Sequence, residues 1–368
     1  MTQVEKDRLI KPIVALALIL CLTHPANAQE RTLTTSEQFA YGSSAFDRFV
    51  RDSYAWTNVP AGDIPPFYKA FDTRSRKVAE DARATGLSEK GVSAYLTSEK
   101  ARISAISDVT KRAAAHTELP ATIFRVVKKA LPLFSLDRGF EFTSATELRE
   151  RQCLLQSVLA AGMLQKAGVP AGVAMVWKSE RGAISNMSHV VAIVRLADGA
   201  DRVLDISSDR KTKFVPDLPH QGLYLSDGAN GYRFVEPQYD DSHRITAYRL
   251  TGTTQEVKPE SMRPLDTSFI RSQFFYYRGE RAGGHLIWSP LDPRSLTISV
   301  DAFTRSLKEC PQNPLTTYML GKVLAWQGKN AEAQNQFVAA YRLYRAQGRV
   351  PDSAQEVYAL EASQQAKD

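Results

Sequence analysis

The stretch that decides the fold spans residues 151–209 and has the sequence RQCLLQSVLAAGMLQKAGVPAGVAMVWKSERGAISNMSHVVAIVRLADGADRVLDISSD. Its first part is almost continuously apolar and predicts a helix from about Gln152 to Lys166, which a Gly-Val-Pro turn ends. Three runs of β type follow, at residues 171–177, 189–196 and 202–206. Because no helix separates these runs, we expect an α+β fold in which one helix packs on an antiparallel sheet.

Three residues of this stretch have side chains that suit nucleophilic catalysis. Cys153 lies at the start of the predicted helix, where the helix dipole favours a thiolate. A nearby histidine accepts the thiol proton, and a carboxylate on the far ring nitrogen stabilises the imidazolium. The chain supplies these groups in order, with 36 residues from Cys153 to His189 and 16 from His189 to Asp205. We therefore predict a catalytic Cys-His-Asp triad.

A predicted hairpin brings two members of this triad together. Residues 197–201 are rich in turn formers and join two β runs. Folding the segment about residue 197 or 198 places Asp205 beside or diagonal to His189, where cross-strand Cβ atoms are about 5 Å apart. A slip of one residue would turn Asp205 away, and Asp209 would then be the alternative carboxylate.

The order of these residues resembles the transglutaminase-like superfamily. The likeness depends on Cys153, Gly-Val-Pro-Ala after the helix, His189 at a strand start and Leu-Asp after a hairpin. The upstream IFRVVKKALPLF and Thr-Ser-Ala segments add to it, so that it covers residues 120–210. The resemblance implies a papain-like core, with Cys153, His189 and Asp205 as the catalytic triad.

The chain departs from the family pattern close to the triad. Relatives commonly have glycine at the position of Arg151 and often arginine at the position of Gly172. Val190-Val191 stand where an aromatic residue commonly follows the histidine. Details of the family's substrate site are therefore not transferred to this chain.

The oxyanion hole has one natural donor in this sequence, the backbone N–H of Cys153. Gln152 and Gln156 are the candidates for a second donor, because both lie near the cysteine and have amide groups. The sequence does not decide between them.

The first 28 residues have the pattern of a secretory signal peptide. Three basic residues precede an apolar run at 13–22, and Ala-Asn-Ala at 26–28 offers a cleavage site. The run is shorter than the about 20 residues that a membrane span needs, although an uncleaved anchor is the alternative. We expect cleavage after Ala28, a periplasmic or secreted protein and no membrane span in the mature chain.

The cysteine count leaves two states open for the predicted nucleophile. Three cysteines are too few for a disulfide scaffold, and removal of the leader keeps only Cys153 and Cys310. Because exported compartments favour disulfides, a Cys153–Cys310 bridge is the alternative to a free thiol.

The rest of the chain predicts helices on both sides of the core. We expect a helical region at 29–119, an α+β domain with a β-rich extension at 120–300 and a helical region at 301–368. In the last region, small and aromatic residues fall at the offsets of a tetratricopeptide repeat: Leu320, Gly321, Gly328, Ala333, Phe337 and Ala340. Such a helical hairpin needs neighbours for stability, so we expect it to pack on the rest of the protein.

The composition excludes several classes of protein and ligand. The chain is 43% apolar and 24% charged, as in ordinary globular proteins. A net charge of +7 without a clustered basic stripe gives no indication of nucleic-acid binding. No zinc-finger spacing, phosphate loop or dinucleotide fingerprint occurs, so we predict no metal and no cofactor.

Together these patterns predict an exported thiol acyl-transfer enzyme that acts on amide bonds of a protein or peptide in the cell envelope. Hydrolysis is favoured over cross-linking because it needs no second amine site. The alternative is a non-catalytic binding or assembly module, in which the core is a scaffold and the C-terminal helices hold a protein partner. A reactive thiolate at Cys153 would favour the enzyme, and a buried or bonded thiol the module.

Overall fold

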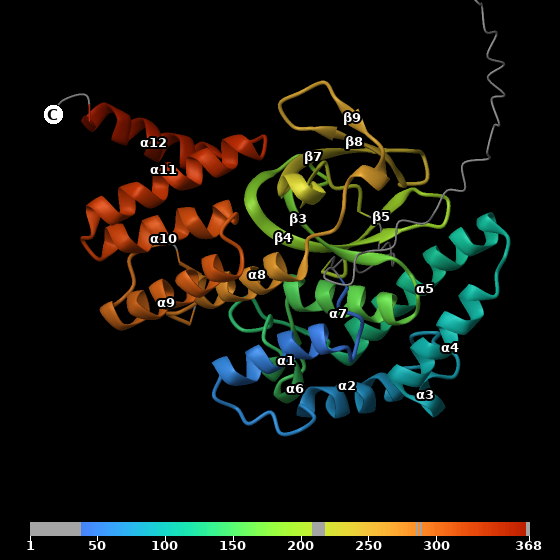
Figure 1. The fold of residues 1–368 in the computed structure, drawn as a ribbon. Coiled ribbons are helices and arrows are strands. Elements are labelled where there is room, and N and C mark those ends of the chain that lie inside the picture. Colours follow the sequence, from blue (N-terminus) through green and yellow to red (C-terminus); the bar gives the residue numbers. More distant parts are fainter. Residues whose placement is uncertain (1–37, 208–217, 285, 288, 366–368) are drawn as a thin grey trace, which may run out of the picture. The chain divides into compact units, whose positions relative to one another are not determined.

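The computed structural model describes residues 38–207, 218–284, 286–287 and 289–365. The expected leader and the alternative carboxylate Asp209 lie outside these residues. The described chain is mixed α and β, with twelve α-helices and one large antiparallel sheet (Figure 1). The α+β class is therefore confirmed.

The helices occur mainly before and after the sheet. In chain order they are α1 (Ser44–Trp56), α2 (Pro66–Lys77), α3 (Leu87–Lys90), α4 (Val92–Ser104), α5 (Val109–Ala130), α6 (Phe142–Glu147), α7 (Cys153–Lys166), α8 (Thr267–Glu280), α9 (Pro293–Glu309), α10 (Pro314–Trp326), α11 (Asn330–Ala346) and α12 (Asp352–Gln365). Among the described helices, none combines the length and the apolar character that crossing a lipid bilayer requires.

The large sheet has the strand order β5-β4-β3-β6-β7-β8-β9, and a pairing of β5 with β8 closes six of its strands into a barrel. Its strands are β3 (Ala171–Lys178), β4 (Ile184–Arg195), β5 (Asp201–Leu204), β6 (Gly222–Ser226), β7 (Tyr232–Tyr239), β8 (Ile245–Leu250) and β9 (Glu256–Val257). A separate short parallel pair joins β1 (Leu133–Phe134) to β2 (Glu150–Arg151). The predicted hairpin is β4–β5, with Arg195 opposite Asp201 and the turn centred on residue 198.

Alternate residues of the strands lie in two separate apolar clusters, as the two-residue period of a strand requires. On β3, Ala174 and Val176 join residues of the five other barrel strands in a cluster that fills the barrel. Val173 and Met175 belong instead to the larger cluster that contains α7. The sheet thus buries both of its faces around β3.

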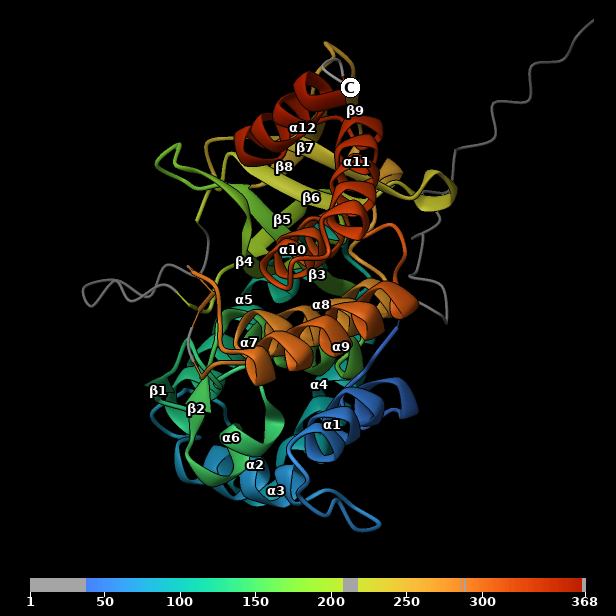
Figure 2. The same cartoon turned by 90° about the vertical axis from the view of Figure 1, so that its left-hand side faces the viewer.

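Helix α7 is the centre of the larger cluster. Its residues from Cys153 to Leu164 are all buried, and it packs on β3, β4, α4 and α5 (Figure 2). On its other side Gly162 admits Phe46 of α1, since a Cβ at residue 162 would lie 2.8 Å from that ring. Such burial on all sides explains the almost continuous apolar sequence of this helix.

The boundaries predicted for the flanking regions fall inside helices. Residue 120 lies within α5, which Asp108 begins by accepting a hydrogen bond from the N–H of Lys111 (2.8 Å). Pro120 is therefore an interior residue of that helix and does not open a new one. Residue 300 lies within α9. All described residues belong to one compact unit.

The segment expected to be a β-rich extension contains a helix, α8, and this corrects the sequence prediction. Its run of aromatic residues, FFYY, is typical of strands. The helix begins because the Asp266 side chain accepts a hydrogen bond from the N–H of Phe269 (2.8 Å). Tertiary packing of these aromatic side chains then favours the helix over their strand propensity.

The C-terminal helices contain the expected hairpin, α10–α11. A Cβ at Gly321 would lie 2.7 Å from the Phe337 ring, so the small residue allows the two helices to approach. The pair before it, α8–α9, repeats this contact, because a Cβ at Gly279 would lie 2.7 Å from Phe303. The hairpin thus has a neighbouring helix pair that packs through the same kind of glycine–phenylalanine contact.

Candidate active site

Cys153 is the first residue of α7, at the positive end of the helix dipole. Gln152 caps the helix, and its side-chain oxygen accepts a hydrogen bond from the N–H of Leu154 (3.1 Å). Strand β2 ends directly before this cap and pairs with β1, so both sides of the thiol are held by regular structure. The residue is 6% exposed.

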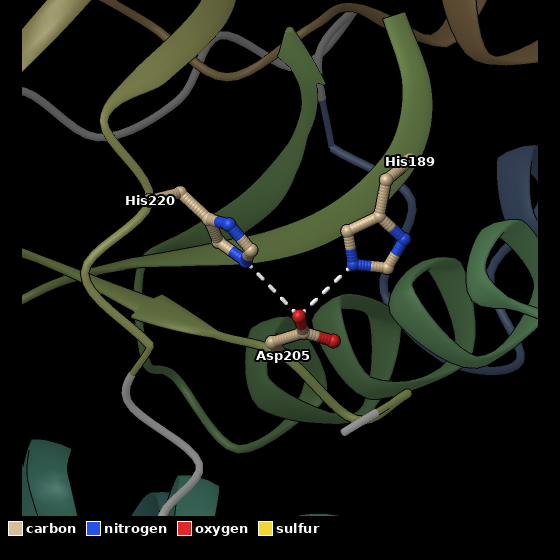
Figure 3. A group of neighbouring side chains, drawn as sticks. All are labelled: His189, Asp205 and His220. Carbon is tan, nitrogen blue, oxygen red and sulfur yellow. Dashed lines mark hydrogen bonds and ion pairs between the residues drawn. The ribbon is translucent and has the colours of Figure 1, made fainter. Parts of the chain in front are cut away.

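His189 and Asp205 contact each other as the hairpin predicts. His189 Nε2 lies 2.9 Å from Asp205 Oδ2 (Figure 3). The β4–β5 register puts Asp205, one residue after β5, diagonal to His189. Ser207 completes the turn, and its hydroxyl donates to Asp205 Oδ1 (2.6 Å). The carboxylate is buried, whereas a quarter of the His189 side chain, 25%, is exposed.

The third predicted contact joins Cys153 to His189, which lie close enough for each side chain to shift the pKa of the other. Because Asp205 occupies Nε2 of the ring, Nδ1 is the nitrogen that remains for the thiol. The structure therefore brings together all three residues that the sequence singled out.

These contacts separate charge among the three side chains. Burial raises the pKa of the Cys153 thiol, but the hydrogen bond and charge of His189 outweigh burial and hold that pKa below its ordinary value. Burial lowers the pKa of His189, yet the Asp205 carboxylate raises it well above the ordinary histidine range. Burial raises the pKa of Asp205, and its histidine partners bring it well below the ordinary range. The three pKa shifts all favour the charged forms of these groups: thiolate, imidazolium and carboxylate.

His220 is a fourth member of the cluster that sequence reasoning missed. It is buried, and its Nε2 lies 3.0 Å from Asp205 Oδ2, the same oxygen that contacts His189. On its far side Nδ1 lies 3.7 Å from Glu180 Oε2. His220 lies outside the stretch 151–209 that predicts the triad, and the pairing of β6 with β3 brings it to the site.

Tyr277 of α8 is the second residue that the sequence did not indicate. Its hydroxyl lies 3.7 Å from Cys153 Sγ, within hydrogen-bonding distance for sulfur. The Arg281 guanidinium lies 4.3 Å from the centre of the Tyr277 ring, and Phe140 stacks on the ring. Because α8 was expected to be β-rich, no helical spacing pointed to Tyr277.

The two cysteines of the described chain are both free and buried, so the alternative of a Cys153–Cys310 bridge is wrong for this structure. Cys310 instead donates a hydrogen bond to the hydroxyl of Tyr232 (3.6 Å). Burial raises the pKa of the Cys310 thiol to about 11. The two thiols therefore differ in ionisation.

The two candidates for a second oxyanion donor are both buried. Gln152 uses its side-chain oxygen to cap α7, which leaves its NH₂ group as the donor. Neither polar atom of the Gln156 side chain has a hydrogen-bond partner within the described residues. The structure does not bring either amide into contact with the triad residues, so the second donor is not assigned.

In the part of the chain that the structure describes, one group of side chains has ligand atoms close enough together to hold a metal ion. The ligand atoms of His189, Asp205 and His220 all lie within 4.8 Å of one another, and Cys153 is not part of this group. The sequence predicted no metal because 16 and 15 residues separate these ligands, unlike any zinc-finger motif.

Comparison with protein-family models, with curated proteins and with solved structures finds no match. Functional inference for this chain therefore depends on its own residues and their geometry.

Proposed function

We propose that the protein is a transglutaminase-like thiol acyl-transfer enzyme that cleaves amide bonds, with Cys153 as the nucleophile. The observation behind this proposal is the contact chain from the Cys153 thiol through His189 to Asp205. We place the activity in the periplasm or outside the cell because residues 1–28 have the pattern of a cleaved leader.

The arrangement of the elements supports the family resemblance. The nucleophile begins a helix, α7, that packs on an antiparallel sheet. The histidine lies on the second strand of that sheet after the helix, and the carboxylate directly follows the third. This chain order and layer arrangement support the proposal of a papain-like core with a Cys-His-Asp triad.

The charges favour a two-step reaction. The Cys153 thiolate attacks the amide carbon, a C–S bond forms, and the oxyanion accepts a hydrogen bond from the Cys153 N–H. The His189 imidazolium then gives its proton to the leaving nitrogen as the C–N bond breaks, which leaves a thioester. A water molecule attacks the thioester, passes its proton to His189, and the C–S bond breaks to release the acid. An amine in place of water would complete a transamidation.

Exposed apolar side chains on the segments near the thiol support a peptide substrate, and they are called the exposed apolar surface below. Its members are Leu133, Phe134, Leu136 and Leu148. Phe134 pairs with Arg151 of β2, two residues before Cys153. The Leu136 carbonyl accepts a hydrogen bond from Arg281, which covers the Tyr277 ring next to the thiol. We infer that this surface contacts apolar side chains of the substrate.

The test compares two cysteine variants of the full-length mature protein. Cys153→Ala is expected to abolish both labelling by a thiol-directed electrophile and hydrolysis of a quenched fluorescent peptide library. Cys310→Ala, the matched control, is expected to retain both. Hydrolysis by the Cys153→Ala protein at the wild-type rate would rule out the proposal.

The burial of Cys153 gives the second candidate function its support. A thiol that is 6% exposed, beneath the Tyr277 hydroxyl, also suits a non-catalytic scaffold. The partner would be an envelope protein bound through the tetratricopeptide-like helices α9–α12. An unreactive Cys153 in a folded protein would favour this function over catalysis.

A further inference from the structure

Asp205 is shared by two histidines from different parts of the chain, His189 on β4 and His220 just before β6. Nε2 of His189 and Nε2 of His220 lie 2.9 and 3.0 Å from the same oxygen, Oδ2, as Figure 3 shows. The two rings are 5.7 Å apart between centroids. The triad chemistry uses only one of these histidines, so it does not account for the second.

Two further contacts surround this group as they would surround a metal site. Histidines that bind metals usually donate their other ring N–H to a carboxylate, and Glu180 Oε2 lies 3.7 Å from Nδ1 of His220. Ligating carboxylates are themselves hydrogen-bonded, and Ser207 donates to Asp205 through its hydroxyl and its backbone N–H (2.6 and 2.9 Å).

A buried polar atom of His220 points the same way. Its Nδ1 has no hydrogen-bond partner within the described residues. This nitrogen is buried and faces a carboxylate. With a cation on Nε2, the ring would carry its proton on Nδ1, from which it could donate a hydrogen bond to Glu180.

We propose that His189, Asp205 and His220 form a binding site for a divalent ion of the zinc class. Two imidazole nitrogens and one carboxylate oxygen match the donors and the number of protein ligands in open zinc sites. With metal–ligand bonds of about 2.0–2.2 Å, neighbouring ligand atoms of a tetrahedral site are roughly 3.3 Å apart. The observed ligand atoms lie within 4.8 Å, so side-chain adjustments of about an ångström would close the site.

The ion and the triad would use His189 in incompatible ways. The ion takes the Nε2 lone pair, so the His189 imidazolium releases one proton to solvent and keeps Nδ1–H. A ring fixed in that form cannot accept a proton, and the base is lost to catalysis. Binding itself depends only on the geometry, whereas this inhibition rests on the proposed thiol chemistry.

The experiment measures metal binding to the metal-free full-length mature protein by competition with a chromophoric zinc chelator. One Zn²⁺ per chain is expected for the wild type, for Cys153→Ser and for His243→Asn, which alters an exposed histidine outside the group. Glu180→Gln is expected to weaken binding by about tenfold and His220→Gln by more than that. Circular dichroism establishes that each variant is folded, and Glu180→Gln tests the site even if His220→Gln does not fold.

A second readout separates this site from a thiol site. Co²⁺ is expected to give the visible bands of a tetrahedral nitrogen and oxygen site, with no thiolate charge-transfer band. Absence of stoichiometric binding, binding unchanged in both Glu180→Gln and His220→Gln, or loss of binding in Cys153→Ser would each overturn the site. Zinc binding by a protein without thiol reactivity would keep the metal site and reject the proposed enzyme; thiol activity without zinc binding would do the reverse.

Discussion

At the scale of single residues, the two described cysteines show how surroundings decide the state of a thiol. Both are buried, and neither forms a disulfide bond. Cys310 contacts the hydroxyl of Tyr232, and burial raises the pKa of its thiol to about 11. Cys153 lies beside His189, which Asp205 contacts in turn, and the combined effects of His189, Tyr277 and a backbone hydrogen bond lower the pKa of the thiol despite its burial. Burial alone is therefore no evidence that Cys153 only fills space in the hydrophobic core.

Replacing the carboxylate tests how the triad is coupled. Asp205→Asn removes the charge that raises the pKa of His189, so the pKa of Cys153 rises and hydrolysis falls by about 1,000-fold or more. Steady-state kinetics on a peptide substrate measures the loss. An Asp205→Asn enzyme within tenfold of wild type would remove Asp205 from the triad.

A second prediction for Asp205→Asn concerns the stability of the folded protein. The pKa of Asp205 is lower in the folded state than the unfolded value of about 3.9, so its ionisation stabilises the fold above that pH. This stabilisation is lost as the pH falls through the acid range. Urea unfolding at several pH values is expected to show a smaller acid-side loss of stability for Asp205→Asn than for wild type.

Tyr277 makes a smaller contribution to the same thiol. Its hydrogen bond lowers the pKa of Cys153, so Tyr277→Phe is expected to raise it. Alkylation at neutral pH should slow about threefold, as expected for a hydrogen bond worth roughly 0.5–1 kcal/mol. Tyr276→Phe is the control, because that hydroxyl donates to Glu280 instead (2.9 Å). Equal rates for Tyr277→Phe and wild type would show that the contact has no effect on the thiol.

At the scale of elements, local signals predicted some structures well and failed for others. The β4–β5 hairpin was predictable from its turn residues to within one residue of register, and the observed register places Asp205. Helix α8 was not predictable, because its aromatic residues favour a strand and only the helix cap at Asp266 indicates its start. Without α8 and the β3–β6 pairing, neither Tyr277 nor His220 was assigned to the site. These residues reach it by tertiary packing, which no short sequence pattern encodes.

The repeated glycine–phenylalanine contact gives a prediction at this scale. A Cβ at Gly279 would meet the Phe303 ring at 2.7 Å, so Gly279→Ala is expected to destabilise the protein by about 1–3 kcal/mol. Phe303→Leu makes room, and the double variant should lose less stability than the sum of the two single variants. Urea denaturation of the four proteins completes the cycle. Additive losses would mean that the two residues do not limit the approach of α8 and α9.

At the scale of the whole molecule, the site draws on distant parts of the chain. Helix α7 supplies the thiol, strand β4 supplies His189, and α8 supplies Tyr277. Asp205 directly follows β5, and His220 lies just before β6. The α8–α9 pair continues into α10 and α11 through further helix contacts, so the C-terminal helices adjoin the thiol through α8. The fold class and the triad were accessible from one continuous stretch, whereas this convergence was not.

The exposed apolar surface gives a prediction at the same scale. Leu136→Asp is expected to lower kcat/KM for peptides that have apolar side chains, because it places a charge where those side chains would be buried. Alkylation of Cys153 by a small reagent should stay at the wild-type rate. Ile64→Asp, at an exposed apolar residue outside this surface, is the control. If kcat/KM fell equally in Leu136→Asp and Ile64→Asp, or in neither, this surface would have no role in substrate binding.

The most direct test of the thiolate–imidazolium pair is the pH dependence of alkylation at each cysteine, followed by mass spectrometry of the wild-type protein. The structure predicts that the alkylation rate of Cys153 rises at a lower pH than that of an ordinary cysteine, because its pKa lies below the ordinary value. Cys310 should react only at strongly alkaline pH, near its pKa of about 11. A Cys153 profile that rises only in alkali, like that of Cys310, would contradict the ion pair and with it the proposed catalysis.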